Sequence, residues 1–596
     1  MTRSGAIKVA RPGSATLRVG TSRAPGEPMD QELGKASKSA GAVASRTYDE
    51  TRDREQLRVL GSAIKEYIDR RMMHGRERQT IFFFPAGTAS HLARADSTFD
   101  ESLAQWQEFT YTRVWLTLDT FVSDVALRLA MHKVPEGDHD SYRDLDNHIV
   151  VADGTVGIFG VEPHTYFLDW CERHDLDYFV FPWDWRRPLE DITAFFVNQF
   201  LPHFQKLVMD AKCPSPLAMF SLVGHSFGGM IANLVLRTES PITAGMRRAI
   251  TVATPFYGYG SQMHRWFEGE PLLNHLGTDR IIKLISSFPS FYTLSFLDLK
   301  TFNANFNALS TDEYPISSYP SVDEKTRKPA DPFNPETQGN QVRYPTSLGF
   351  DPGELDHGNR IARRLIAPLN KALSEKFYNI RAVQLGIGTA SGITWDWIPP
   401  RRPPFSSPIA NDMYARGDDT QPAWTARLLD TKAPFHRKQC ISVEGRGDSF
   451  HHIFLMNNQA IHNAMGNALG LGLRAQRIHK GRKMPIATSE KAIAAVQARY
   501  ETHANMPGAS TKQRARKAAA APWESAFSPE VALRILMDIL KRSPTTVGTY
   551  DKPAARATAK TRRSLAKSTP DASVATTESG NGKARKHLPR TRSSVK

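Results

Sequence analysis

The stretch from residue 216 to residue 238 (PLAMFSLVGHSFGGMIANLVLRT) constrains the fold of this chain more than any other, because its local pattern changes twice over a short distance. Residues 220–223 (FSLV) form an apolar run typical of a buried strand, and residues 229–238 carry apolar side chains at helical spacing. Between them, residues 224–228 (GHSFG) hold a serine flanked by glycines. The stretch therefore predicts a strand, a tight turn at Ser226 and a helix.

The turn has the pattern of a nucleophilic serine. Its five residues match G-x-S-x-G, in which a sharp strand-to-helix turn holds the serine hydroxyl clear of the backbone and the glycines leave room for the turn. Because the chain contains 39 glycines, the five letters alone could arise by chance. The flanking strand and helix favour a nucleophile at Ser226 over an ordinary glycine turn. His225 is expected to point away from the hydroxyl and to pack.

Short apolar runs and amphipathic stretches alternate along much of the chain. Strands are expected within residues 80–92, 175–189, 247–256, 377–390 and 438–445, and helices within 54–72 and 191–211. Such alternation predicts an α/β fold whose mostly parallel central sheet is covered by helices on both faces. The alternation lapses between about 260 and 375, where aromatic residues, Pro and Asn are frequent, and an inserted cap or lid is expected there.

The two ends of the chain differ in composition from its body. The predicted division is a disordered segment at 1–50, a catalytic domain at 51–475 that includes the cap, a basic helical extension at 476–545 with helices at 488–500 and 528–542, and a disordered basic tail at 546–596.

The net charge of +16 is confined to these flanks. Lys and Arg outnumber Asp and Glu by 8 to 3 in residues 1–46, by 11 to 2 in 473–520 and by 12 to 3 in 551–596, whereas acids exceed bases by seven in 47–472. Basic flanks of this composition are typical of solvated segments, and a loose contact with anionic lipid surfaces is the alternative. Nucleic-acid binding is not favoured, because residues 551–596 offer no aromatic side chain for base stacking besides one His.

The three cysteines, Cys171, Cys213 and Cys440, have no spacing typical of a disulfide framework or a zinc site, which suits a reducing compartment. The N-terminus lacks the apolar segment of a secretory signal, and no run of about 18 apolar residues occurs, so neither a signal peptide nor a transmembrane helix is expected. We expect a cytoplasmic protein, peripheral to a membrane surface at most, that needs no metal or other cofactor.

A nucleophilic serine needs a basic partner, and that base needs a carboxylate to hold its tautomer. At a strand–turn–helix site of this kind, the chain order is nucleophile, acid, histidine. His451 and His452 follow a predicted strand and loop and precede a helix-like run, which is where the base is expected. Asp418, between two predicted strands, is favoured as the acid over Asp448, which is expected to brace the histidine loop.

Six segments between about residue 80 and residue 470 share motifs with one enzyme family. They are PAGTASHL (85–92, family P-G-x-x-G-S-x-L), VWL (114–116), PWDWR (182–186, family Y-D-W-R), ATPFYG (253–258, family A-T-P-x-x-G), GDDT (417–420, family G-D-[GD]-T-V) and HHIFLMNNQ (451–459). Together with the GHSFG turn, these segments resemble the lecithin:cholesterol acyltransferase family, which includes phospholipid:diacylglycerol acyltransferases and lysosomal phospholipases.

The resemblance implies an α/β-hydrolase fold and a catalytic triad of Ser226, Asp418 and His451. His451 is favoured over His452 because the histidine segment of the family then aligns without a gap. The separation of 33 residues between Asp418 and His451 also suits the family.

Backbone N–H groups are expected to bind the oxyanion that forms during acyl transfer. One belongs to Phe227, directly after the nucleophile, and the resemblance implies that the other belongs to Gly87. Three further residues are expected either to line the acyl pocket or to brace the edge of the sheet. They are Trp183, Asp184 and Trp185. Arg186 is interpreted as a structural partner of Asp184.

Three features depart from the family pattern. Ala86 stands where the family has Gly, Gln421 and Pro422 follow Thr420 where the family has Val, and the disulfide cysteines of the secreted members have no counterpart. The expected function is serine-dependent acyl transfer on lipid or similar apolar esters, through an acyl-enzyme that passes its acyl group to an alcohol or to water. The alternatives are a plain lipase or carboxylesterase and a non-catalytic lipid-binding module of the same fold.

Overall fold

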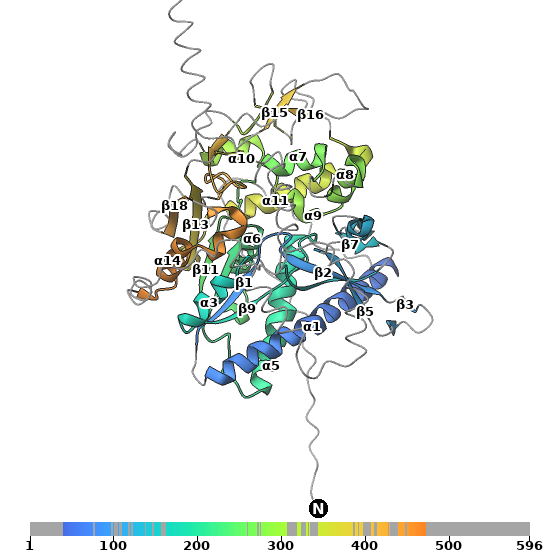
Figure 1. Ribbon diagram of the computed structural model, residues 1–596. Coiled ribbons are helices and arrows are strands. Elements are labelled where there is room, and N and C mark those ends of the chain that lie inside the picture. The colour runs from blue at the N-terminus through green and yellow to red at the C-terminus, as the bar shows by residue number, and fades with distance from the viewer. Residues whose placement is uncertain are drawn as a thin grey trace, which may run out of the picture. The chain divides into compact units, whose positions relative to one another are not determined.

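The structure, a computed structural model, describes much of the chain between residues 40 and 472 (Figure 1). The gaps within this range are 75–77, 97–98, 101–104, 107–109, 117–119, 121–122, 137–138, 146–147, 157–162, 259, 271–272, 274–275, 307–318, 324–328, 332, 334–343, 386–387, 391–392, 397–406, 410–413, 427, 429–438 and 447–449. The predicted helices at 488–500 and 528–542, the basic extension beyond residue 472, the C-terminal tail and most of the predicted N-terminal disordered segment lie outside the described residues.

A parallel sheet forms the centre of the fold. Its strands, in spatial order, are β18 (Cys440–Gly445), β13 (Phe377–Gln384), β11 (Met246–Val252), β10 (Phe220–His225), β1 (Thr80–Phe84) and β9 (Asp177–Val180). Every neighbouring pair in this sheet runs parallel. The prediction of a mostly parallel central sheet is confirmed, and each strand lies within a stretch that the sequence marked as apolar.

The two faces of the sheet carry separate apolar layers, because successive side chains of a strand point to opposite faces. Phe82 and Phe84 of β1 belong to one layer, whereas Ile81 and Phe83 belong to the other. The first layer includes buried residues of α1, α4, α5 and α6, and the second includes those of α3 and α14. The bounds of these helices are Ala40–His74 (α1), Thr165–Arg173 (α3), Leu189–Phe195 (α4), Leu201–Asp210 (α5), Phe227–Arg237 (α6) and Gln459–Ala468 (α14). Helices therefore cover both faces, as predicted.

The N-terminal helix is longer than the sequence predicted. It begins at Ala40, inside the segment expected to be disordered, and ends at His74. The predicted helix at 191–211 is observed as α4 and α5 joined by a π-helical turn, η3 (Phe196–Phe200).

Smaller β elements lie between β1 and α3 in the chain. An antiparallel sheet has the order β5 (Thr110–Trp115), β2 (Ser90–Asp96), β8 (Val150–Thr155). Two antiparallel pairs are β6 (Met131–Glu136) with β7 (His139–Asp144), and β3 (Phe99–Asp100) with β4 (Gln105–Trp106). The 3₁₀-helix η1 (Asp124–Leu129) precedes β6.

The segment between β11 and β13, where the sequence predicts a cap, is largely helical in its described parts. It contains α7 (Gly260–Glu268), α8 (Thr278–Ser286), α9 (Pro289–Tyr292), α10 (Leu299–Phe306), β12 (Ser321–Asp323), the 3₁₀-helix η6 (Thr346–Leu348), α11 (Pro352–Ile366) and α12 (Lys371–Ser374). Figure 1 shows α7 to α11 gathered above the strands of the central sheet. The short strand β12 pairs with β15 (Ile393–Asp396), which pairs in turn with β16 (Ser407–Ile409).

Four short elements complete the described part of the chain. They are the 3₁₀-helices η4 (Pro241–Thr243) and η8 (His452–Asn457), and the antiparallel pair β14 (Gly388–Ala390) and β17 (Tyr414–Arg416).

Candidate active site

Ser226 lies at the tight turn between β10 and α6, in a backbone conformation that few residues adopt. Its φ of 54° and ψ of −125° are outside the regions open to most side chains. A Cβ on Gly224 would come within 2.5 Å of the Gly228 carbonyl oxygen, and one on Gly228 would come within 2.4 Å of the Phe84 carbonyl oxygen. Both glycines of the motif are thus required by close backbone contacts, and the predicted strand, turn and helix are observed.

His452 is the histidine that lies against Ser226. Its Nε2 is 2.7 Å from Ser226 Oγ, and its Nδ1 is 2.8 Å from Asp418 Oδ2. Because Asp418 accepts the proton of Nδ1–H, Nε2 is left as the acceptor for the serine hydroxyl. The side chains form a continuous serine–histidine–aspartate hydrogen-bond chain, in the chain order expected from sequence.

The preference for His451 over His452 is therefore corrected. His451 instead forms a hydrogen bond through Nδ1 with Asp419, and about a third of its side chain is exposed. The backbone N–H of His452 donates to the carbonyl of Asp418 (3.0 Å) and to Asp419 Oδ1 (3.1 Å). Two consecutive acids thus hold two consecutive histidines, and only the buried pair reaches Ser226.

Asp418 is held by the backbone of its own loop. Its Oδ1 accepts the backbone N–H of Gln421 (2.8 Å) and of Thr420 (3.3 Å), which leaves Oδ2 for His452. The residue is 1% exposed. Burial raises the pKa of the carboxyl, and the charge and hydrogen bond of His452 oppose that rise. Asp448, the alternative acid, lies outside the described residues.

The protonation of His452 is set by two opposing effects. Burial lowers the pKa of its imidazole, but the charge of Asp418 and the hydrogen bond to it raise the pKa by more, so the net shift is upward. The neighbouring His225 ring is buried, with its centroid 5.0 Å from that of His452. Burial and the nearby charge of His452 hold the pKa of His225 well below its usual value, so it packs as a neutral ring.

The two residues expected to bind the oxyanion are adjacent in space. Phe227 is the first residue of α6, and the first N–H groups of a helix have no acceptor within the helix. A Cβ on Gly87 would come within 2.8 Å of Phe227 Cδ1, so the loop after β1 lies directly against the residue that follows the nucleophile. This arrangement brings two backbone segments to one side of Ser226, where an oxyanion could be bound.

Gln421 is a site residue that the sequence marked only as a departure from the family pattern. Its Nε2 lies 3.2 Å from Ser226 Oγ and 3.5 Å from His452 Nε2, and the residue is 3% exposed. Gln421 follows Asp418 by three positions, and this short separation is the sequence signal that could have indicated Gln421 as a site residue.

Trp183 and Trp185 are both buried, but they contact different parts of the fold. The Trp183 ring packs edge-on against Phe227, with a centroid distance of 5.4 Å, and its Nε1 donates to the Pro85 carbonyl (3.0 Å). Trp185 stacks on Phe291 of α9 at 5.8 Å, so it joins the sheet to the inserted helices. The Trp183 side chain thus helps to shape the turn region, whereas Trp185 supports the insertion.

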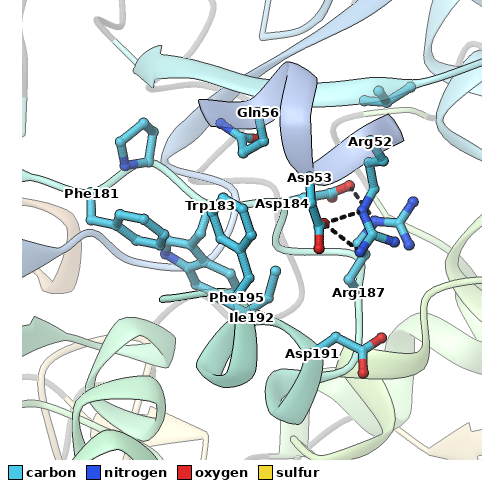
Figure 2. A pocket seen from close by; sticks show the side chains of 12 residues that line it. Arg52, Asp53, Gln56, Phe181, Trp183, Asp184, Arg187, Asp191, Ile192 and Phe195 are labelled. Atoms are coloured by element: carbon cyan, nitrogen blue, oxygen red, sulfur yellow. Dashed lines mark hydrogen bonds and ion pairs between the residues drawn. The ribbon is translucent and has the colours of Figure 1, made fainter. Parts of the chain in front are cut away.

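Asp184 belongs to a buried ion-pair network. Its carboxylate accepts from Arg186 Nε (2.8 Å) and Nη2 (2.6 Å), and Arg186 also donates to Asp144 (2.7 Å). The interpretation of Arg186 as the structural partner of Asp184 is confirmed. Figure 2 shows a small cavity beside this network, lined by Trp183 and Phe195 on one side and by charged residues on the other. These charged residues are Arg52, Asp53, Asp184, Arg187 and Asp191.

Replacing Asp184 with asparagine is expected to destabilise the fold with little effect on chemistry at Ser226. Removing one partner of a buried ion pair leaves an uncompensated charge and costs about 3–5 kcal/mol. The free energy of unfolding, measured in urea, should fall by that amount, while kcat of the folded variant stays within about threefold. Asp210→Asn, which breaks the exposed pair with Lys206, is the matched control and should cost less than about 1 kcal/mol. Unchanged stability with lost turnover in Asp184→Asn would instead place Asp184 in the substrate site.

No group of three or more His, Cys, Asp or Glu side chains in the described ranges is arranged to hold a metal ion. No helix in the part of the chain that the structure describes combines the length and the apolar character that crossing a membrane requires. Cys171, Cys213 and Cys440 form no disulfide bond.

Comparison with known proteins adds little to this geometry. No family model and no curated protein matches the chain. Among solved structures, one chain from "The crystal structure of Tle4-Tli4 complex" aligns with 67% of this chain and 99% of its own length, at 12% identity and a TM-score of 0.37. A likeness at that score supports no conclusion about fold or activity, so the function proposed below rests on the geometry around Ser226.

Proposed function

We propose that the protein is a serine-dependent enzyme that acts on lipid or similar apolar esters through an acyl-enzyme. Ser226 is the nucleophile, His452 the general base and Asp418 the acid that orients it. The observation that carries the proposal is the contact of 2.7 Å between His452 Nε2 and Ser226 Oγ, continued to Asp418 at 2.8 Å. A serine hydroxyl becomes a useful nucleophile at neutral pH when a correctly oriented base takes its proton.

The proposed reaction follows from these positions. As Ser226 Oγ attacks the ester carbonyl, its proton passes to His452 Nε2, and Asp418 stabilises the imidazolium that forms. The negative carbonyl oxygen of the tetrahedral intermediate is bound by the N–H groups of Phe227 and Gly87. His452 then gives its proton to the leaving alcohol, and an acyl group remains on Ser226. A second nucleophile, activated by His452, releases it.

The fold that we propose is of the α/β-hydrolase type. A parallel sheet, helices on both faces, a nucleophile at a strained strand-to-helix turn and the order Ser226, Asp418, His452 support it. The motifs that resemble the lecithin:cholesterol acyltransferase family point in the same direction, with O-acyltransferase or phospholipase activity as the finer expectation.

Apolar side chains next to the acid loop support an apolar substrate. Trp424, six positions after Asp418, packs on Phe302 of α10 (6.0 Å between ring centroids) and on Phe296 (6.4 Å), so the insertion rests directly on the loop that carries the acid. Trp183 packs on Phe227, the residue that directly follows the nucleophile. We propose that the insertion is the lid through which an apolar acyl chain enters.

The substrate class is tested by incubating the full-length protein with vesicles of mixed phospholipids that carry a radiolabelled acyl chain, with and without a sterol or diacylglycerol. We expect labelled fatty acid or labelled acyl acceptor to appear, and Ser226→Ala to produce neither. Vesicles with and without anionic lipid test whether the basic flanks favour an acidic surface. Release of p-nitrophenol from short esters without any cleavage of lipids would show a different ester class.

A further inference from the structure

Gln421 has an unusual position for a side chain that is not part of the hydrogen-bond chain from Asp418 to Ser226. Its amide is buried, and Nε2 contacts Ser226 Oγ (3.2 Å) and approaches His452 Nε2 (3.5 Å). The orientation of the amide is consistent with the chemistry, because Ser226 donates its proton to His452 and its oxygen can accept one from Gln421 Nε2. Nε2 is therefore the atom next to the serine.

The other atom of the amide, Oε1, is buried and has no hydrogen-bond partner among the described residues. An unsatisfied buried acceptor costs free energy, and native proteins seldom keep one without a use. The amide geometry places Oε1 about 2.3 Å from Nε2, so Oε1 lies no more than about 5.8 Å from His452 Nε2. One molecule that makes a hydrogen bond of about 2.8 Å to each atom can bridge a separation of up to about 5.6 Å, which covers nearly all of the range below that limit.

We infer that Gln421 selects water as the acyl acceptor; this inference rests on the proposed acyl-enzyme. Water has two protons. One is donated to His452 Nε2, the other to Gln421 Oε1, and a lone pair of the oxygen is then free to face the acyl carbon. An alcohol has one hydroxyl proton, and His452 must receive it. The carbon atom of the alcohol would then occupy the place in which the second proton of water binds Oε1, and it cannot make that hydrogen bond.

The step balances with these groups alone. The water oxygen forms a bond to the acyl carbon while its first proton moves to His452 Nε2. The tetrahedral intermediate collapses, the bond between the acyl carbon and Ser226 Oγ breaks, and His452 returns the proton to Oγ. The second proton of water, held by Gln421 until then, leaves with the carboxylic acid. Gln421 is thus a positioning residue for the second half-reaction.

The test is the partition of one acyl-enzyme between two acceptors. The full-length protein is given p-nitrophenyl butyrate in water with 1-butanol, and butyric acid and butyl butyrate are quantified together. Gln421→Met keeps the length of the side chain without the amide, and Gln421→Leu is a second apolar variant. We expect the ratio of butyl butyrate to butyric acid to rise about 10- to 100-fold in both, because the site no longer holds the second proton of water.

The partition ratio is measured per turnover, so a smaller folded fraction of a variant does not alter it. Gln421→Glu, which keeps an acceptor oxygen, should stay within about threefold of the unmodified protein. Gln459→Leu is the matched control, because its amide instead donates to Asn463 Oδ1 (3.0 Å) on α14. An unchanged ratio in the apolar variants would overturn the inference, as would complete loss of ester cleavage in both, since the amide would then serve the first half-reaction. Failure of the proposed function would look different: ester cleavage by the unmodified protein would be absent or independent of Ser226.

Discussion

Replacing Ser226 with alanine is expected to reduce kcat for ester cleavage on the order of 10⁶-fold and to abolish labelling by a fluorophosphonate probe. The hydroxyl is the group in the proposed site that bonds to the acyl carbon, and its described neighbours His452 and Gln421 are assigned to other steps. The oxyanion donors that remain would leave a residual acceleration over water of about 10³- to 10⁴-fold. Turnover of p-nitrophenyl butyrate and gel-based labelling of the full-length protein measure both effects.

The variant should fold, because alanine and serine tolerate the strained turn at φ 54° equally. Ser221→Ala, on the strand β10 that leads to the turn, is the matched control. Ser221 is buried like Ser226, but its hydroxyl accepts a hydrogen bond from Gln79 (2.5 Å) instead of lying against His452. Its turnover should stay within about threefold. Full fluorophosphonate labelling of Ser226→Ala would show that another residue is the nucleophile.

The second large effect separates the two adjacent histidines. His452→Ala is expected to lower kcat by about 10⁴- to 10⁶-fold, because Ser226 then has no base and Asp418 is left as an unpaired buried acid. His451→Ala removes a partly exposed contact with Asp419 and should lower kcat less than about tenfold. Steady-state kinetics of the two variants with the same ester measure the difference.

The pH profile gives an independent readout of the same prediction. The base must be neutral to take the serine proton, so kcat/KM falls as the pH drops through the pKa of His452. Because Asp418 raises that pKa above its usual value of 6.5, the acid limb of the profile should lie above pH 6.5. The limb should persist in His451→Ala. A larger loss of activity in His451→Ala than in His452→Ala would show that the contacts of the two histidines are exchanged in solution.

Much of the site could be predicted because its determinants are local. The turn at Ser226 follows from a strand, two glycines and a helix that are continuous in the chain, and the structure shows each glycine in a backbone contact that admits no side chain. Asp418 could be predicted because it lies in the connection between the neighbouring parallel strands β13 and β18, and the carboxyl ends of parallel strands meet at one edge of a sheet. The adjacency of Gly87 and Phe227 follows from the pairing of β1 with β10.

The choice between His451 and His452 could not be made from local sequence patterns. Neighbouring residues in a loop point in directions set by the backbone dihedrals, and here His452 opens a 3₁₀ turn while Asp419 adopts a positive φ of 75°. Those dihedrals depend on the contacts of the loop with Asp418 and on the burial of the following helix. The gap-free alignment with the family motif contains no information about these dihedrals, and it favoured His451 instead of His452.

Local patterns were sufficient to predict the α/β architecture, the turn at Ser226 and the contact of Asp418 with a histidine, because strand and helix periodicity and glycine sterics act over a few residues. Three contacts are evident only in the folded chain: His452 lies against Ser226, Gln421 contacts both of them, and the pair of Asp184 and Arg186 extends to Asp144. Each of these depends on the direction of one side chain relative to a segment far away in the chain. That direction is set by packing across the whole fold rather than by any local pattern.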